Sequence, residues 1–166
     1  LDTETTGLDK NAEIIQIAII NDHGTVLLDE FVRPSKPIPA EVTLLHGIRD
    51  DMVANARSWP ALWPTVRGLI LGKTIGIYNA EFDVRMMRQS LERYRLPWRE
   101  SLTTLDILQL FSEFRGDWDP LRRTLRRFKL EEAGRFFRIP LPNSHRAVDD
   151  ALLARALLRR LADLDY

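Results

Sequence analysis

The chain has 166 residues, enough for a single domain with a buried core, and 45% of them are hydrophobic while 29% are charged. Its 24 Lys and Arg balance its 24 Asp and Glu, so no overall basic field indicates a nucleic-acid partner, although an acidic site could offset a basic binding face. The chain contains no cysteine, which excludes disulfides and thiolate ligands. Any metal must be held by carboxylates, histidines or carbonyls, which suit hard cations such as Mg²⁺ or Mn²⁺.

No apolar run in the sequence approaches the roughly 18 residues that span a bilayer, and we expect no signal peptide. We therefore expect a cytoplasmic protein with no membrane partner. We also expect one domain over residues 1–166, with a few further residues of its first strand preceding Leu1.

The predicted elements begin with an antiparallel hairpin, because two apolar, β-branched segments at 13–21 and 26–34 flank a run of turn residues. Glycines are expected to end the first two helices, at Gly47 and Gly72. In chain order, the elements after the hairpin are a helix within 40–48, a helix over 59–71, a strand at 73–78, a helix over 79–95, a strand at 101–107, a helix over 108–114, an irregular segment at 115–128, and helices within 130–139 and 144–164. Early strands followed by this alternation predict an α/β domain with a mixed sheet.

The carboxylates Asp2 and Glu4 stand two residues apart at the start of the chain, in LDTETTG. If residues 1–4 end a strand, both side chains point to the same face of the sheet. The Thr-Thr-Gly that follows would then form the turn that leaves the strand. Read alone, this stretch fits a solvated turn as well as a pair of metal ligands.

The helix over 79–95 turns one acid inward. Its apolar stripe consists of Val84, Met87, Leu91 and Tyr94. Asp83 falls within that stripe, where a carboxylate without a partner loses solvation or shifts its pKa until it is neutral. The alternative is that Asp83 caps its own helix, although a cap does not require the inward face.

The last helix repeats this pattern. Its buried stripe consists of Ala147, Ala151, Ala154, Leu157, Leu158 and Leu161. Asp150 lies inside the stripe, whereas Asp149 lies about 100° away on the solvated face. His145 precedes the helix, where a loop could hold its ring beside the same cleft or leave it as a surface or capping residue. Since no Lys or Arg shares either stripe near these acids, two divalent cations are the expected compensation.

Three segments resemble, in this order, the motifs of the DEDDh 3′–5′ exonucleases. This family belongs to the DnaQ-like superfamily and includes the proofreading epsilon subunit of bacterial replicative DNA polymerase. The segments are DTETTG, NAEFD and HRAVDD, and the resemblance covers Asp2 to about Leu161. In the third motif, the family has an Asp five residues after the His. This spacing from His145 selects Asp150, which is also the residue that lies on the buried face of the helix. Tyr78 departs from the family, which often has His before the Asn-Ala pair.

The resemblance implies a ribonuclease-H-like fold with a mixed five-stranded sheet flanked by helices, and release of nucleoside monophosphates from a 3′ end. It implies that Asp2 bridges two divalent cations, Mg²⁺ or Mn²⁺. Glu4 and Asp150 would complete one site, and Asp83 would hold the second cation, partly through water. His145 would deprotonate the attacking water. The residues implied to line the pocket of the terminal nucleotide are Thr5, Thr6, Leu8, His46, Asn79 and Phe82.

Three functions remain open. The first is a proofreading or repair exonuclease acting on single-stranded 3′ ends of DNA, with a polymerase or another replication protein as a candidate partner. The second applies the same chemistry to RNA, and the third is an inactive module that docks onto a polymerase, which has no reason to keep four inward acids. Residues 115–138 hold eight Arg or Lys against four acids, and the cluster at 122–127 predicts either a solvated face or a patch that contacts the backbone of the incoming strand.

Overall fold

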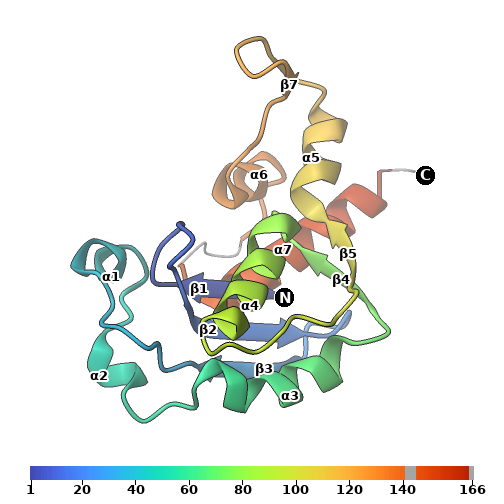
Figure 1. The fold of residues 1–166 in the computed structure, drawn as a ribbon. Coiled ribbons are helices and arrows are strands. Elements are labelled where there is room, and N and C mark those ends of the chain that lie inside the picture. Colours follow the sequence, from blue (N-terminus) through green and yellow to red (C-terminus); the bar gives the residue numbers. More distant parts are fainter. Residues whose placement is uncertain (141–144, 165–166) are drawn as a thin grey trace.

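The computed structural model describes residues 1–140 and 145–164 (Figure 1). Three antiparallel strands form its centre in the order β1 (Asp2–Thr5), β2 (Ile14–Ile20) and β3 (Val26–Phe31). The strand β2 is buried over most of its length because it has a strand on either side and helices on both faces. The predicted hairpin is confirmed, and its turn is closed by the Asn21 side chain, which accepts hydrogen bonds from two backbone amides of the turn.

A second sheet lies beside the first. Its strands β4 (Thr74–Ile77) and β5 (Thr103–Asp106) pair in parallel. The backbone nitrogen of Leu1 donates to the Gly76 carbonyl at 3.0 Å, which places the start of β1 next to β4. A single sheet of five strands was expected. Within the described residues, these strands form a sheet of three and a sheet of two, because the one hydrogen bond between Leu1 and Gly76 does not make a continuous β-ladder between β1 and β4. The segment expected to be irregular contains two further short strands, β6 (Trp118–Asp119) and β7 (Thr124–Leu125).

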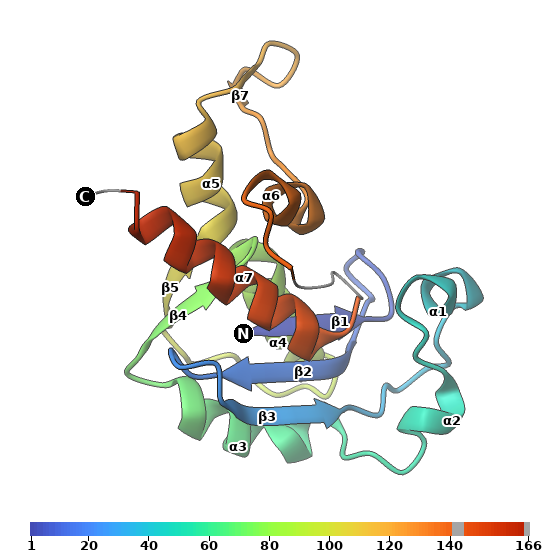
Figure 2. The same cartoon turned by 180° about the vertical axis from the view of Figure 1, so that it is seen from behind.

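Helices cover both faces of the central sheet (Figures 1 and 2). The helix α7 (Ala147–Ala162) packs on one face of β1 and β2, while α3 (Trp59–Ile70) and α4 (Ala80–Glu92) cover the other. The remaining helices of the described part of the chain are α1 (Ala40–His46), α2 (Asp50–Val53), α5 (Ile107–Arg115) and α6 (Leu130–Phe136). No helix in residues 1–140 and 145–164 is long and apolar enough to cross a membrane.

Most helix boundaries follow the sequence prediction. Gly47 directly follows α1 and Gly72 lies two residues beyond the end of α3. Both adopt left-handed conformations, with φ of 71° and 74°, so the predicted stops are confirmed. The helix α7 begins at Ala147, so His145 precedes it as predicted. Ser144, the first residue of the segment within which this helix was predicted, lies outside the described residues.

Two main clusters form the core. The first lies between the strands and α3 and α4, and the second between α5, α6 and α7. In the second cluster, aromatic rings pack with centroids 5.0 to 6.3 Å apart, and they belong to Phe111, Phe114, Phe128, Phe136 and Phe137. This cluster packs α5 and α6 against α7. Between them, residues 116–129, here called the arm, project outward (Figures 1 and 2).

Candidate active site

The strand β1 directs Asp2 and Glu4 to one face of the sheet. Its burial alternates, with Thr3 buried on the opposite face, as the period of a strand requires. Glu4 lies opposite Gln16 in β2, and directly paired residues share a face. Gln16 accepts a hydrogen bond from the first amide of α7, so this is the face that α7 covers.

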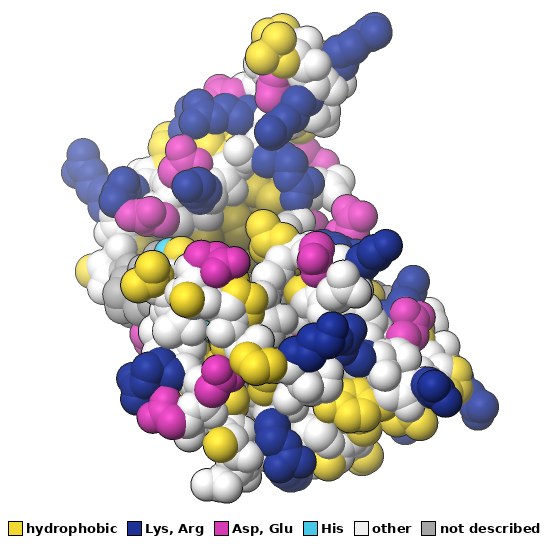
Figure 3. Space-filling model, turned by 60° about the vertical axis from the view of Figure 1, so that its left-hand side comes forward, with side chains coloured by type: hydrophobic (Ala, Val, Ile, Leu, Met, Phe, Trp, Pro, Cys, Tyr) yellow, Lys and Arg dark blue, Asp and Glu magenta, His cyan; other side chains and the backbone are white. Residues whose placement is uncertain are grey.

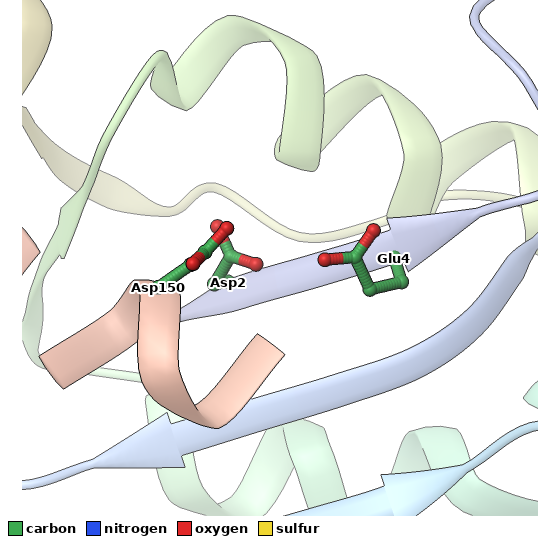
Figure 4. Close-up of side chains that lie close together, drawn as sticks. All are labelled: Asp2, Glu4 and Asp150. Carbon is green, nitrogen blue, oxygen red and sulfur yellow. The ribbon is translucent and has the colours of Figure 1, made fainter. Parts of the chain in front are cut away.

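Helix α7 brings a third acid to the same place. Asp150 is only 7% exposed, whereas its neighbour Asp149 is half-buried, so the inward orientation predicted for Asp150 is confirmed. Carboxylate oxygens of Asp2, Glu4 and Asp150 all lie within 4.8 Å of one another (Figure 4). Three carboxylate oxygens at this spacing could bind one cation, and oxygen ligands suit hard cations such as Mg²⁺ or Mn²⁺.

The fourth predicted acid, Asp83, reaches β1 from the other face. It is 3% exposed at the start of α4, and its Oδ1 atom accepts a hydrogen bond of 2.7 Å from the Thr3 hydroxyl. Thr3 is paired with Ile17, whose side chain belongs to the core on the α4 side. Asp83 therefore lies outside the group of three carboxylates, although it is close enough to influence the charge of two of them.

Burial and mutual repulsion oppose ionisation of these acids. Burial raises the pKa of Asp2 well above its usual value, and Asp83, Glu4 and Asp150 raise it further. Burial, followed by Asp150 and Asp83, raises the pKa of Glu4 to about 8. Burial also raises the pKa of Asp83 to about 7, against the hydrogen bond from Thr3. A divalent cation would supply the missing positive charge, so the residues present fit a metal.

Arg146 is a neighbour of the acids that the sequence prediction missed. It precedes the first turn of α7, lies over the Phe31 ring at 5.6 Å, and lowers the pKa of Glu4. The expectation that neither helical stripe carries a cation near the acids is not contradicted, because Arg146 precedes α7 and lies in neither stripe. The helical stripes could not reveal Arg146, because a residue before a helix does not follow the periodicity of the helix. His145 stands beside it in a left-handed conformation, with φ of 51°.

The threonines after Glu4 use their hydroxyl groups within the turn. The Thr5 hydroxyl donates to the Gly7 carbonyl at 2.7 Å, and the Thr6 hydroxyl accepts from the Glu13 amide at 2.9 Å. These bonds fix the direction in which the chain leaves β1. Leu8 follows at the surface, 77% exposed, so its side chain is available to a ligand.

His46 packs at the same end of β1, from the last turn of α1. Its Nδ1 atom accepts a hydrogen bond from the Ile48 amide at 3.0 Å. Its Nε2 atom is buried and makes no hydrogen bond that meets the usual distance and angle limits within the described residues. The nearby Thr5 carbonyl acts to raise the pKa of the ring. Burial nevertheless lowers the pKa of His46, so the neutral imidazole is favoured.

Asn79 and Phe82 lie at the start of α4. Asn79 adopts a left-handed conformation, with φ of 68°, and its amide donates to Asp106. Asp106 also accepts from the amides of Ala80, Leu108 and Gln109, so one carboxylate joins the starts of α4 and α5. Phe82 is partly buried against the first core cluster. The role of Asp106 was not predicted, since the sequence shows only an acid before a helix.

Comparison with known proteins identifies relatives of this chain. The family model described as Exonuclease, RNase_T, matches residues 1–158. The uncharacterized exonuclease CP81 of Escherichia phage 186 is 34% identical over 169 residues, which cover 98% of this chain and 86% of that protein. The PolC-type DNA polymerase III of Caldanaerobacter subterraneus subsp. tengcongensis is 32% identical over 154 residues. That match covers 90% of this chain but only 10% of the polymerase.

A solved structure has the same fold. It is the nuclease domain of 3′hExo, a DEDDh family member, bound to rAMP. The TM-score is 0.74 at 19% identity, and the match covers 98% of this chain and 90% of that one. The expected ribonuclease-H-like α/β fold is thereby confirmed.

Proposed function

The chain belongs to the RNase_T exonuclease family, as its three motifs predicted, and we propose that it is a metal-dependent 3′–5′ exonuclease of the DEDDh type. It would hydrolyse the last phosphodiester bond at the 3′ end of DNA and release nucleoside 5′-monophosphates. The observation that carries this proposal is the approach of the Asp2, Glu4 and Asp150 oxygens to within 4.8 Å of one another.

The acids would hold two divalent cations, Mg²⁺ or Mn²⁺. Asp2, Glu4 and Asp150 would bind one of them, and Asp83 would bind the second together with Asp2. When bound, such cations lower the pKa of water and neutralise charge on the reacting phosphate. The raised pKa values of Glu4 and Asp83 support this assignment, because these acids ionise fully at neutral pH only with added positive charge.

His145 would act as the general base. It lies next to the first turn of α7, the helix that carries Asp150, and an imidazole readily accepts a proton near neutral pH. His145 would take the proton of the attacking water, and the electron pair of the breaking P–O bond would leave with the 3′ oxygen of the shortened strand. Arg146 would add positive charge beside the phosphate, since it already favours the ionised form of Glu4.

The terminal nucleotide would lie between β1, α1 and α4. The exposed Leu8 and the partly buried Phe82 would offer apolar surface to its base or sugar. Thr5 and Thr6 would shape the turn beneath it, while His46 and Asn79 would flank it. These assignments follow the motif residues and are proposals for each position.

DNA is the favoured substrate because the PolC-type relative is a DNA polymerase that contains a similar segment. RNA is the second candidate, since 3′hExo was solved with rAMP bound. The polymerase relative also makes a polymerase or another replication protein a candidate partner, and the cytoplasm the expected location. The buried acids argue against an inactive docking module, because such a module gains nothing from them.

A digestion assay tests the proposal. Single-stranded DNA and RNA of the same sequence, each labelled at the 5′ end, are incubated with the protein and Mg²⁺, Mn²⁺ or EDTA. We expect a ladder that shortens from the 3′ end, monophosphate products, a faster rate on DNA and no cleavage in EDTA. A substrate with a blocked 3′ end is the control. Cleavage that persists in EDTA, or internal cleavage of the blocked substrate, would contradict the proposal, and a faster rate on RNA would select the second candidate.

A further inference from the structure

The arm concentrates positive charge in a chain whose formal net charge is zero. Residues 116–129 contain five basic side chains against two acidic ones, which gives a local net charge of +3. The basic residues are Arg122, Arg123, Arg126, Arg127 and Lys129. Figure 3 shows Lys and Arg side chains crowding the upper part of the molecule, above a hollow whose floor is hydrophobic. A strand of phosphates is the charge-complementary ligand for such a surface.

The tip of the arm is a hydrogen-bonded turn that exposes apolar side chains to solvent. Asp119 closes the turn, because its side chain accepts from the Leu121 and Arg122 amides and its carbonyl accepts from the Arg123 amide. Leu121 is 94% exposed and Trp118 62% exposed. Apolar and aromatic side chains placed beside arginines are typical of surfaces on which unpaired bases stack.

The arginines of the cluster differ in what they contact. Arg126 pairs with Glu132 at 3.3 Å and lies over the Phe128 ring at 4.7 Å, so it serves the packing of the arm. The Arg122 guanidinium lies 3.9 Å from the Asp119 carboxylate, which is a long distance for an ion pair. The Arg123 side chain has no polar partner among the described residues. The two arginines next to Leu121 are therefore the ones most available to phosphates.

The stem of the arm is attached to the start of the helix that carries Asp83. The Tyr78 hydroxyl donates to the Phe128 carbonyl at 2.9 Å, and the Arg127 guanidinium donates to the Asn79 side chain at 2.5 Å. Tyr78 is the residue that departs from the family motif, and its hydroxyl supplies one of these bonds. The arm is thus held in a fixed direction relative to α4 and the acids.

From these contacts, and resting on the proposed exonuclease function, we infer that the arm binds the single-stranded segment of the substrate that lies upstream of the terminal nucleotide. Arg122 and Arg123 would contact its phosphates, while Trp118 and Leu121 would pack against its bases. The arm would then favour long strands over short ones, whereas the terminal nucleotide alone would not reach it.

Binding of oligonucleotides in EDTA tests the arm without catalysis. Fluorescence anisotropy compares labelled oligothymidylates of two, eight and sixteen residues with the full chain and two tip variants. One variant is Trp118→Ala with Leu121→Ser, and the other is Arg122→Ala with Arg123→Asn, since Asn tolerates the left-handed φ of 55° at that position. We expect each variant to bind the longer strands about tenfold more weakly and the dinucleotide equally well. The arginine variant should also flatten the salt slope by about 1.4, as two lost phosphate contacts require.

The matched control is Arg99→Ala with Arg95→Asn. Both arginines are exposed beyond the far end of α4, and Arg95 has a similar left-handed φ of 60°. This variant should bind every strand as the unmodified chain does. Equal length dependence in the tip variants and the unmodified chain, or an equal loss in the control, would overturn the inference. So would tip variants that lose a replication protein but keep their affinity for oligonucleotides.

The outcomes separate this inference from the proposed function. Tip-dependent binding in a chain that never shortens 3′ ends would refute the exonuclease proposal alone. Unchanged binding and cleavage of long strands by the tip variants, in a chain that does shorten 3′ ends, would refute the role of the arm alone.

Discussion

Thr3 links the two sides of β1. Its hydroxyl donates to the buried Asp83 carboxylate on the α4 face, while the neighbouring Asp2 and Glu4 point to the α7 face. The hydrogen bond favours the ionised form of Asp83, which is the form that binds a cation. A threonine between two acids thus connects the group of three carboxylates with the fourth.

Replacing Thr3 with valine removes this hydroxyl and keeps the shape of the side chain. We expect Thr3→Val to raise the pKa of Asp83 further and to lower metal affinity or activity about 10- to 100-fold, the usual effect of losing a partner that orients a metal ligand. Titration with Mn²⁺ and 3′-end digestion measure the effect. Thr3→Ser restores a hydroxyl and should recover much of the loss. Unchanged affinity and activity in Thr3→Val would show that Asp83 needs no such support.

At the residue scale, the sequence predicted the acids better than their neighbours. Asp150 could be distinguished from Asp149 because the helical period separates adjacent residues by about 100°. Arg146 and Asp106 could not be found in this way, since both precede helices, where contacts depend on the tertiary fold. Asp83 was correctly expected to be buried, but its approach from the opposite face of β1 depends on the placement of α4, which no local pattern contains.

At the scale of elements, Asp106 fastens two helices to each other. Its carboxylate caps α5 and also accepts hydrogen bonds from the backbone amides of Asn79 and Ala80 at the start of α4. The left-handed Asn79 is held by this arrangement, as is the turn that leads to Asp83. The stability of the site therefore depends on a residue outside the three motifs.

Asp106→Ala should destabilise the fold by about 3 kcal/mol, since a lost N-cap costs about 1 kcal/mol and two further, partly buried amides lose their acceptor. Urea unfolding measures this change. The control is Asp51→Ala, because Asp51 is exposed and its ion pair with Arg49 lies at the surface, so its loss should change stability by less than about 0.5 kcal/mol. A loss below about 1 kcal/mol in Asp106→Ala would mean that water or another group satisfies these amides.

Elements with strong local signals were predicted well, whereas the two-residue strands of the arm were not predicted. The hairpin and the helices ended by Gly47 and Gly72 have strong local signals, and all of them are confirmed. The strands β6 and β7 are two residues each and lie in an arginine-rich segment, so no period could reveal them. The direction of the arm depends on single contacts such as the bond from Tyr78 to Phe128, which only the structure shows.

At the scale of the whole molecule, the acids couple folding to pH. Between the usual pKa of 4.5 and about 8, folded Glu4 keeps a proton that the unfolded chain has released. The folded state then binds more protons, so stability without metal is greatest at the acidic end of this window and falls as pH rises toward 8. A cation that binds only ionised carboxylates acts in the opposite direction, and its stabilisation grows with pH.

Thermal unfolding between pH 6 and 8.5 should show both trends. In EDTA, the Tm should fall as pH rises, and the increase in Tm on adding Mn²⁺ should become larger, with about 2–4 °C for each kcal/mol in a domain of this size. Glu4→Gln, which cannot ionise at this position, should weaken both trends. An increase in Tm that is the same at every pH would show that the metal does not displace protons from these acids.

Digestion of one 5′-labelled DNA strand by three proteins side by side tests the central claim most directly. The unmodified chain, Asp150→Asn and Asp149→Asn are compared with Mg²⁺ at equal concentration, after thermal unfolding has shown that all three are folded. The structure places only Asp150 with Asp2 and Glu4, so Asp149→Asn should shorten the strand from its 3′ end at nearly the unmodified rate. Asp150→Asn should be slower by more than about 100-fold, because it alters a proposed metal ligand and not merely a supporting residue. Full activity in Asp150→Asn, or a loss confined to Asp149→Asn, would contradict the account.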